Sequence, residues 1–133
     1  MAGEQQTDAA IDARTVYAAA GGAATFDRIV ARFYEGVESN PLLRPLYPED
    51  LVESRRRLAL FLAQYFGGPP TYSQERGHPR LRLRHLPFAI GRAERDAWMR
   101  HMDAAVRAEG LPAPLEATLL DYFERAATFM INR

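Results

Sequence analysis

The sequence contains no cysteine and no lysine, so all 17 of its basic residues are arginines. Without cysteine the chain can form no disulfide, no thiolate zinc site and no thioether-linked cofactor. Without lysine it can form no Schiff base and no phosphate-binding loop of the Walker type. These two absences exclude several common classes of enzyme and binding site.

An excess of either charge is also absent, because 17 acidic residues balance the arginines. A general nucleic-acid-binding protein would be basic, so we expect no nucleic-acid partner. No apolar run approaches the roughly 20 residues that cross a bilayer, and residues 1–12 do not resemble a secretory signal. We therefore expect a cytoplasmic protein with no membrane partner.

Length and composition predict one folded domain. The chain has 133 residues, of which 47% are hydrophobic and 26% charged, as in ordinary globular proteins. We expect this domain to occupy residues 13–133. Residues 1–12 are polar and rich in alanine, and we expect them to form a mobile tail.

Apolar residues recur at helical spacing in almost every segment, and no strand-like alternation is sustained, so we predict an all-α fold. The clearest helix starts at Thr25 as its N-cap and buries one apolar stripe: Phe26, Ile29, Val30, Phe33, Tyr34 and Val37. Further helices are predicted over 50–66 and 91–108 and from 114 onward, with shorter pieces at 13–20 and 42–46. Their expected inner faces are Ser54, Leu58, Phe61 and Tyr65; Trp98, Met102 and Ala105; and Leu115, Leu119, Tyr122, Phe123, Ala126 and Met130.

Residues 67–91 are predicted to form a long loop that ends in one or two helical turns before Pro87. Loops of this length inside a compact domain tend to be functional. Four arginines lie in it (Arg76, Arg80, Arg82 and Arg84), and no acidic residue occurs between 76 and 91. The local charge of +4 requires either a bound anion or carboxylates from elsewhere in the fold.

Only three histidines are present. His101 is expected on a solvated helix face and His78 in a turn, whereas His85 lies among apolar residues in the last turn of a short helix. One histidine is too few to hold zinc, but a single imidazole suffices for haem, whose propionates would balance the arginines. The alternative is a core histidine in a haem-free, all-α interaction module whose arginine-rich loop meets an acidic partner.

Several motifs, in order and with compatible spacing, resemble those of the group II truncated haemoglobins. The resemblance covers roughly residues 15–131. It rests on Gly21-Gly22, Phe33-Tyr34, Leu46-Tyr47-Pro48, the run from Phe61 to Pro69, Thr71-Tyr72-Ser73, the run from Arg76 to Arg82, Arg84-His85, Pro87-Phe88 and the run from Glu94 to Met99.

This resemblance implies a two-over-two helical sandwich around non-covalent haem b, with His85 as the proximal iron ligand. Tyr34, Tyr47 and Trp98 match the polar aromatics around the gas ligand. The other implied site residues fall into three groups: Ser54, Leu58 and Phe61 in the distal pocket; Tyr72, His78, Arg80 and Arg84 near the propionates; and Leu46, Leu81, Phe88 and Met102 packed on the haem. Ser54 stands where globins often place a distal histidine.

The implied function is binding of O2 and other diatomic ligands at a five-coordinate iron. Three donors would hold such a ligand tightly, which suits redox chemistry with nitric oxide or peroxide better than oxygen transport. CO is a further expected ligand, and turnover would need an electron donor. The sequence leaves open whether the protein is a gas binder or an enzyme, such as a nitric oxide dioxygenase or a peroxidase-like protein.

Adjacent Tyr122 and Phe123 suggest a homodimer surface.

Overall fold

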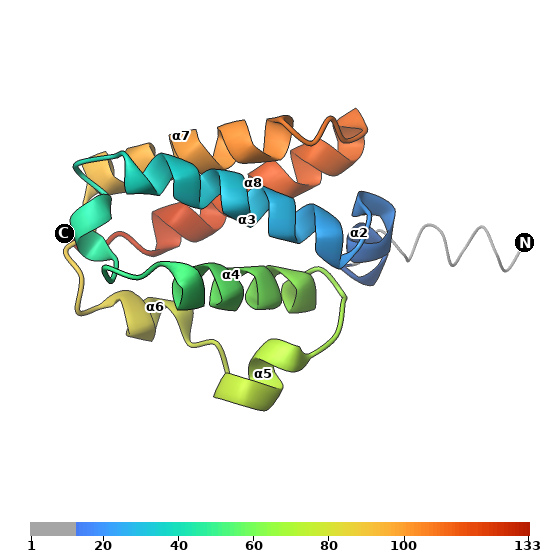
Figure 1. Cartoon of the computed structure of the whole chain (residues 1–133), viewed down its shortest axis with the longest axis horizontal. Helices are drawn as coiled ribbons and strands as arrows, with labels where there is room; N and C mark the ends of the chain where they lie inside the picture. Colours follow the sequence, from blue (N-terminus) through green and yellow to red (C-terminus); the bar gives the residue numbers. More distant parts are fainter. Residues whose placement is uncertain (1–12) are drawn as a thin grey trace, which may run out of the picture.

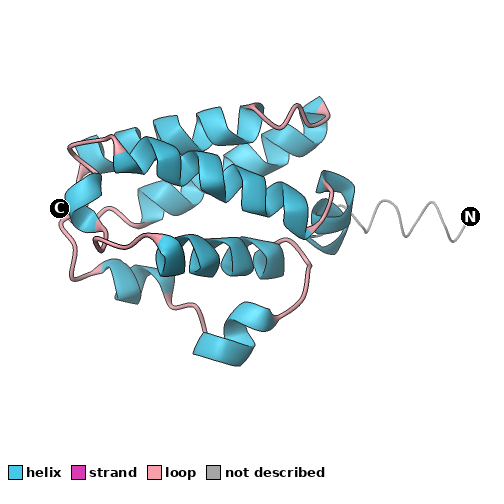
Figure 2. Ribbon diagram, in the orientation of Figure 1, coloured by secondary structure: helices cyan, strands magenta, loops and turns pink. Residues whose placement is uncertain are grey.

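The computed structural model describes residues 13–133, so the predicted tail 1–12 lies outside it. The described part is built from helices and contains no strand, which confirms the predicted all-α class (Figures 1 and 2). The elements are α2 (Ala13–Ala20), α3 (Ala23–Glu38), the 3-10 turn η1 (Arg44–Leu46), α4 (Val52–Tyr65), α5 (Thr71–Arg76), α6 (Leu81–His85), α7 (Arg92–Arg107) and α8 (Ala113–Phe129). None of these helices has the length and apolarity that a bilayer crossing requires.

Four long helices form the two layers of the molecule. Helix α3 packs against α4 and α7, and α7 packs against α8. In Figure 1 the short helices α5 and α6 lie beyond α4, on the side away from α3. The pairs α3–α4 and α7–α8 therefore enclose the core, and α5 and α6 close one side of it.

The predicted stripe of α3 is buried in full, but the helix begins earlier than predicted. Its N-cap is Gly22, and Gly21 and Gly22 both have positive φ angles (112° and 72°), which turn the chain sharply out of α2. Thr25 lies inside the first turn and is buried. Its hydroxyl donates to the carbonyl of Ala20 at 2.6 Å, so Thr25 joins α2 to α3 and is not the N-cap.

The ends of the other long helices agree with the sequence prediction within a few residues. Asp50 Oδ1 accepts the Val52 N–H at 2.9 Å where α4 starts, and Glu94 Oε1 accepts the Gly91 N–H at 2.8 Å where α7 starts. Tyr65 is the exception to the predicted inner face of α4. Its side chain is 44% exposed, although its ring packs on Tyr122 with 4.1 Å between centroids.

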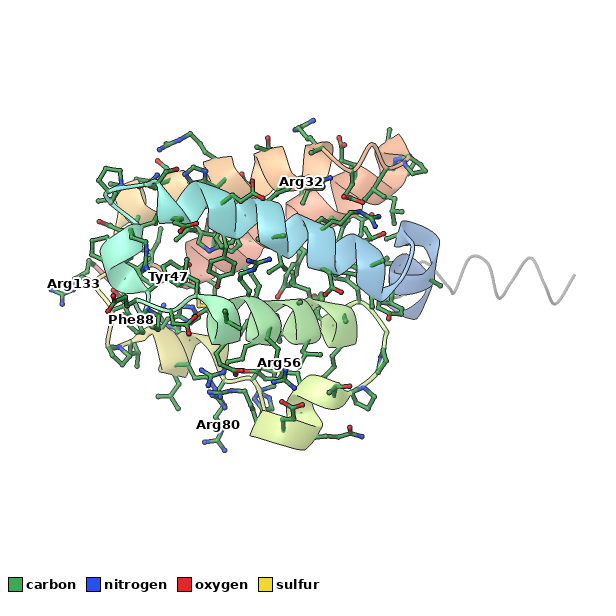
Figure 3. All side chains as sticks on the ribbon, viewed as in Figure 1. Arg32, Tyr47, Arg56, Arg80, Phe88 and Arg133 are labelled. Atoms are coloured by element: carbon green, nitrogen blue, oxygen red, sulfur yellow. The ribbon has the colours of Figure 1, made fainter. Side chains whose placement is uncertain are left out.

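The segment 67–91 contains the predicted short helix α6 and a second one, α5, that was not predicted. Helix α5 is held to α4 because Gln64 bonds both the Ser73 hydroxyl (2.7 Å) and the Ser73 N–H (2.9 Å). Arg80 starts α6 in the left-handed region, with φ 46°, and extends outward from the molecule (Figure 3). These contacts place His85, the last residue of α6, beside the core.

Candidate functional site

One largely apolar pocket opens between the helix layers and α6, and it gathers most of the predicted site residues. The predicted residues that line it are Tyr34, Leu46, Tyr47, Leu58, Phe61, Leu81, His85, Phe88 and Trp98. They come from α3, η1 and the residue after it, α4, α6 and the residues following it, and α7. A broad apolar slot with a few convergent polar groups is the usual form of a cofactor site.

His85 is the histidine on the wall of this pocket, and one hydrogen bond sets its tautomer. Its Nδ1 lies 2.6 Å from the carbonyl oxygen of Leu81, one turn earlier in α6. A carbonyl can only accept, so Nδ1 carries the proton and donates it to this bond. In the neutral ring the lone pair is then on Nε2, and the same carbonyl bond orients the ring, as is common for metal-ligating histidines.

The segment after His85 is anchored by Asn132, near the end of the chain. Asn132 Nδ2 donates to the carbonyls of Phe88 (2.9 Å) and His85 (3.3 Å), and its Oδ1 accepts the Ile90 N–H at 2.9 Å. These bonds fix the backbone that carries the wall of the pocket from His85 to Ile90.

Three polar aromatics bring hydrogen-bond donors to the pocket. The rings of Tyr34 and Tyr47 meet edge to face with centroids 5.5 Å apart, and Trp98 packs on Phe33 at 5.1 Å. The indole N–H of Trp98 interacts with the Tyr47 oxygen. The sequence prediction that these three residues share one pocket is therefore matched by their positions.

Burial raises the pKa values of both tyrosines, so that their hydroxyls stay protonated well above neutral pH. It raises the pKa of Tyr47 to about 12, with the Trp98 N–H opposing the shift in part. The pKa of Tyr34 is raised further, first by burial and then by the neighbouring Tyr47. Both side chains therefore present O–H groups, so that a ligand in the pocket meets donors and not phenolates.

Six predicted site residues lie outside the lining. Met102 is fully buried in the core, Ser54 is half-buried on α4, and Tyr72 is buried against Phe61 at 5.5 Å between rings. The other three belong to the arginine-rich segment: His78, Arg80 and Arg84. Of these, His78 is exposed, and its Nδ1 accepts the backbone N–H of Arg80 at 3.0 Å.

Two arginines of this segment each have a buried nitrogen that lacks a hydrogen-bond acceptor. The Nε atoms of Arg76 and Arg84 are buried and have no partner. Arg84 donates through its other nitrogen to the carbonyls of Arg76 (3.1 Å) and His78 (3.5 Å). Among residues 13–133, none of the four arginines between 76 and 84 forms an ion pair with a carboxylate, so carboxylates elsewhere in the described fold do not balance their charge.

Sequence reasoning did not assign ten lining residues to the site: Leu43, Leu62, Ile90, Glu94, Arg95, Tyr122, Phe123, Ala126, Ala127 and Met130. Four of them had been expected to face inward from α8. Arg95 was unforeseen, although it lies three residues before Trp98 and thus on the same face of α7. It pairs with Asp96 at 3.0 Å and with Glu124, and donates to Thr128 at 3.2 Å.

Two expectations about surface residues are wrong. Phe123 is 1% exposed and Tyr122 lines the pocket, so these aromatics give no exposed patch for a homodimer. His101 is half-buried and bonded to Asn40, because α7 packs its polar side against α3 at this point.

The metal-ligating side chains present fit haem b better than a bare metal ion. In residues 13–133 no group of three or more His, Asp or Glu side chains is placed to hold a metal ion, so His85 suits an ion whose other ligands come with the cofactor. The apolar lining suits a porphyrin. Outside the lining, the buried nitrogens of Arg76 and Arg84 without a partner are of the kind that binds carboxylates.

Comparison with known proteins also indicates a haem-binding protein. The model of the family "Bacterial-like globin" matches residues 15–132. A group 2 truncated haemoglobin of Bacillus subtilis is 44% identical over 112 residues, covering 84% of this chain and 85% of that protein.

Solved structures of truncated globins share the two-over-two fold. Haemoglobin from Chloroflexus aurantiacus aligns with a TM-score of 0.87 and 54% identity, over 89% of this chain and 98% of that one. The group II truncated haemoglobin of Bacillus anthracis aligns with a TM-score of 0.85 and 37% identity, over 88% and 95%. This chain therefore belongs to the bacterial-like globins and, within them, to the group II truncated haemoglobins, which bind haem b without a covalent link.

Proposed function

We propose that this protein binds O2 and other diatomic ligands at a five-coordinate haem iron whose protein ligand is Nε2 of His85. The observation that carries the proposal is the bond from His85 Nδ1 to the Leu81 carbonyl, on the wall of a pocket that also contains three hydrogen-bond donors. Haem b supplies a ferrous iron that binds a diatomic ligand and undergoes one-electron oxidation and reduction. His85 supplies the neutral imidazole, already in the required tautomer.

Tyr34, Tyr47 and Trp98 act on the diatomic ligand. Each offers a donor in a largely apolar pocket, and a hydrogen bond to a partly charged acceptor contributes about 1.5–3 kcal/mol. One well-placed donor therefore slows ligand release by about one to two powers of ten. CO accepts such bonds less strongly than O2, so the same residues discriminate between the two ligands.

We propose redox use of the retained ligand, in reaction with nitric oxide or with peroxide as the ligand. Slow release makes oxygen transport inefficient, whereas it keeps a polarised ligand in place for a second reactant. Repeated turnover then needs electrons from another protein. Stopped-flow mixing of the oxygenated protein with nitric oxide, followed by assays of reductant-dependent turnover, separates an enzyme from a gas binder.

The arginines of α5 and α6 are proposed to hold the propionates. Arg84, together with Arg76, which the sequence reasoning had not assigned to this role, has a buried guanidinium nitrogen without an acceptor. Tyr72 and Arg80 remain proposed contacts near them, with His78 as a further one.

Absorption spectroscopy tests the proposal. The purified protein should contain about one haem per chain, and its Soret band should shift on reduction and again with CO. His85→Gly should lose stoichiometric haem or give an altered ferrous spectrum, and free imidazole should restore the parent spectrum. Retention of the parent spectrum by His85→Gly without imidazole would overturn the ligand assignment.

The haem-free interaction module that the sequence left open now has little support, since the family binds haem. This alternative would regain support only if the purified protein took up no haem from solution.

A further inference from the structure

Tyr47 lies outside any helix, so its position depends on the segment between α3 and α4. The Tyr47 N–H donates to the Arg44 carbonyl at 3.2 Å, and the Arg44 N–H donates to the Asn40 carbonyl at 2.9 Å. The Arg44 guanidinium in turn reaches the carbonyls of Pro48 (2.8 Å) and Glu49 (2.6 Å). The position of Tyr47 therefore depends on a chain of backbone hydrogen bonds that begins at Asn40.

The Asn40 side chain organises the start of this segment. Its Oδ1 accepts the N–H groups of Leu42 (2.9 Å) and Leu43 (3.1 Å), which fixes the turn that buries Leu43 in the pocket wall. Because the oxygen is committed to these two donors, the amide nitrogen points the other way. It lies 2.9 Å from Nε2 of His101.

His101 can complete this arrangement only as a neutral ring. The Asn40 nitrogen is a donor, so Nε2 of His101 must carry a lone pair and not a proton. Its ring is pressed against α3 at Gly36, where an added Cβ would lie 2.2 Å from Nδ1. Glycine at position 36 is thus what allows the ring to approach Asn40.

We propose that Asn40 and His101 form an acid-sensitive clasp that positions Tyr47, and that the clasp holds only while His101 is neutral. His101 lies on α7, one turn after Trp98. Helix α7 therefore carries one pocket donor, Trp98, and positions a second one, Tyr47. The inference rests on the proposed donor role of Tyr47.

Protonation of His101 costs the clasp a hydrogen bond whichever way Asn40 turns. In the present orientation two donors, Nε2–H and the amide, would face each other. If the amide rotated to offer its oxygen to His101, its nitrogen would face the Leu42 and Leu43 N–H groups. The turn before Tyr47 therefore loosens in acid in either case.

The surroundings of His101 favour the neutral ring at ordinary pH. Among the described residues around it, Arg100 on α7 is the charged group that acts on the ring. The contacts from the other side are uncharged: Gly36 of α3 and Asn40 in the turn after α3. Burial, and then Arg100, lower the pKa of His101 below its ordinary value of 6.5. The clasp is thus closed at neutral pH and opens as the pH falls through that lowered value.

Nuclear magnetic resonance of the CO-bound holoprotein tests the clasp directly. The amide signals of Leu42 and Leu43 should titrate with the same midpoint as the His101 ring. In His101→Gln they should be flat with pH, because glutamine offers an uncharged acceptor to Asn40. Signals that do not follow the His101 midpoint would overturn the proposal.

The rate of O2 release is the second measurement. In the parent protein it should rise about threefold to tenfold as His101 protonates, whereas His101→Gln should stay slow and lack that step. His101→Leu should release O2 quickly at all pH values. If His101→Leu fails to fold, the test is the comparison of two pH profiles of the O2 release rate: flat in His101→Gln and stepped in the parent.

A Tyr47→Phe variant separates failure of this inference from failure of the donor role. If Tyr47→Phe releases O2 at the parent rate, the donor role is wrong. If it releases O2 faster, but the parent shows no step with the His101 midpoint, the donor role stands and the clasp is wrong.

Discussion

At the scale of single residues, proton positions determine what the pocket can bind. His85 donates through Nδ1 to a carbonyl, which leaves Nε2 as the nitrogen proposed to bind iron, and burial raises the pKa values of Tyr34 and Tyr47. Trp98 adds an N–H that can only donate. The pocket thus contains one imidazole proposed as an iron ligand and three hydrogen-bond donors.

Removing a single donor should therefore speed ligand release. We expect O2 to dissociate about 10 to 100 times faster from Trp98→Phe or Tyr34→Phe than from the parent, because one charge-assisted bond is lost. Stopped-flow displacement of O2 by CO measures the rate. Tyr65→Phe is the matched control, since Tyr65 is outside the lining, and its rate should be unchanged. Parent-like rates in both pocket variants would refute the donor role.

At the scale of elements, α5 and α6 are too short to be stable alone and depend on contacts between them. Arg84 supplies one such contact by donating from α6 to the carbonyl of Arg76, the last residue of α5. The buried Nε atoms of both arginines lack acceptors, which is costly unless an anion is bound. The proposed haem propionates would supply these missing acceptors.

Replacing Arg84 should loosen haem without changing its axial ligand. We expect Arg84→Gln to transfer haem to apomyoglobin about tenfold faster than the parent while its ferrous spectrum stays the same, as loss of one bond to a carboxylate predicts. Arg57→Gln on the exposed side of α4 serves as the control. With haem dimethyl ester, which lacks the carboxylates, the parent and Arg84→Gln should lose the cofactor at equal rates. A remaining tenfold difference would show that Arg84 acts only on the fold.

At the scale of the whole molecule, one carboxylate joins the two helix layers. Glu109, in the turn between α7 and α8, accepts bonds from Arg28 (2.9 Å) and Arg32 on α3, and its side chain is only 4% exposed. The guanidinium of Arg28 is the main cause that lowers the pKa of Glu109, against the opposing effect of burial.

This contact should give stability that depends on pH. A carboxyl with a lowered folded pKa stabilises fully above its ordinary value of 4.5 and loses that contribution as the pH falls through the lowered value. We expect Glu109→Gln to reduce the free energy of unfolding by about 1 kcal/mol at pH 7, since both arginines are partly solvated.

Urea unfolding at equal haem occupancy measures this difference. The gap between Glu109→Gln and the parent should shrink as the pH is lowered below 4.5, whereas Asp121→Asn, at an exposed pair on α8, should match the parent throughout. A gap that is constant with pH would mean that Glu109 acts through packing and not through its charge.

The sequence by itself determined the four long helices and the apolar stripe of α3, and it singled out His85 as the candidate ligand, because helical periodicity and motif spacing are local properties of the chain. The order and spacing of the motifs also sufficed to identify the family. Tertiary structure decided the contacts between elements: Thr25 as a link to α2, Arg95 in the pocket wall, and His101 bonded to Asn40. Such pairings depend on which faces meet when helices pack, and spacing along one helix does not encode them.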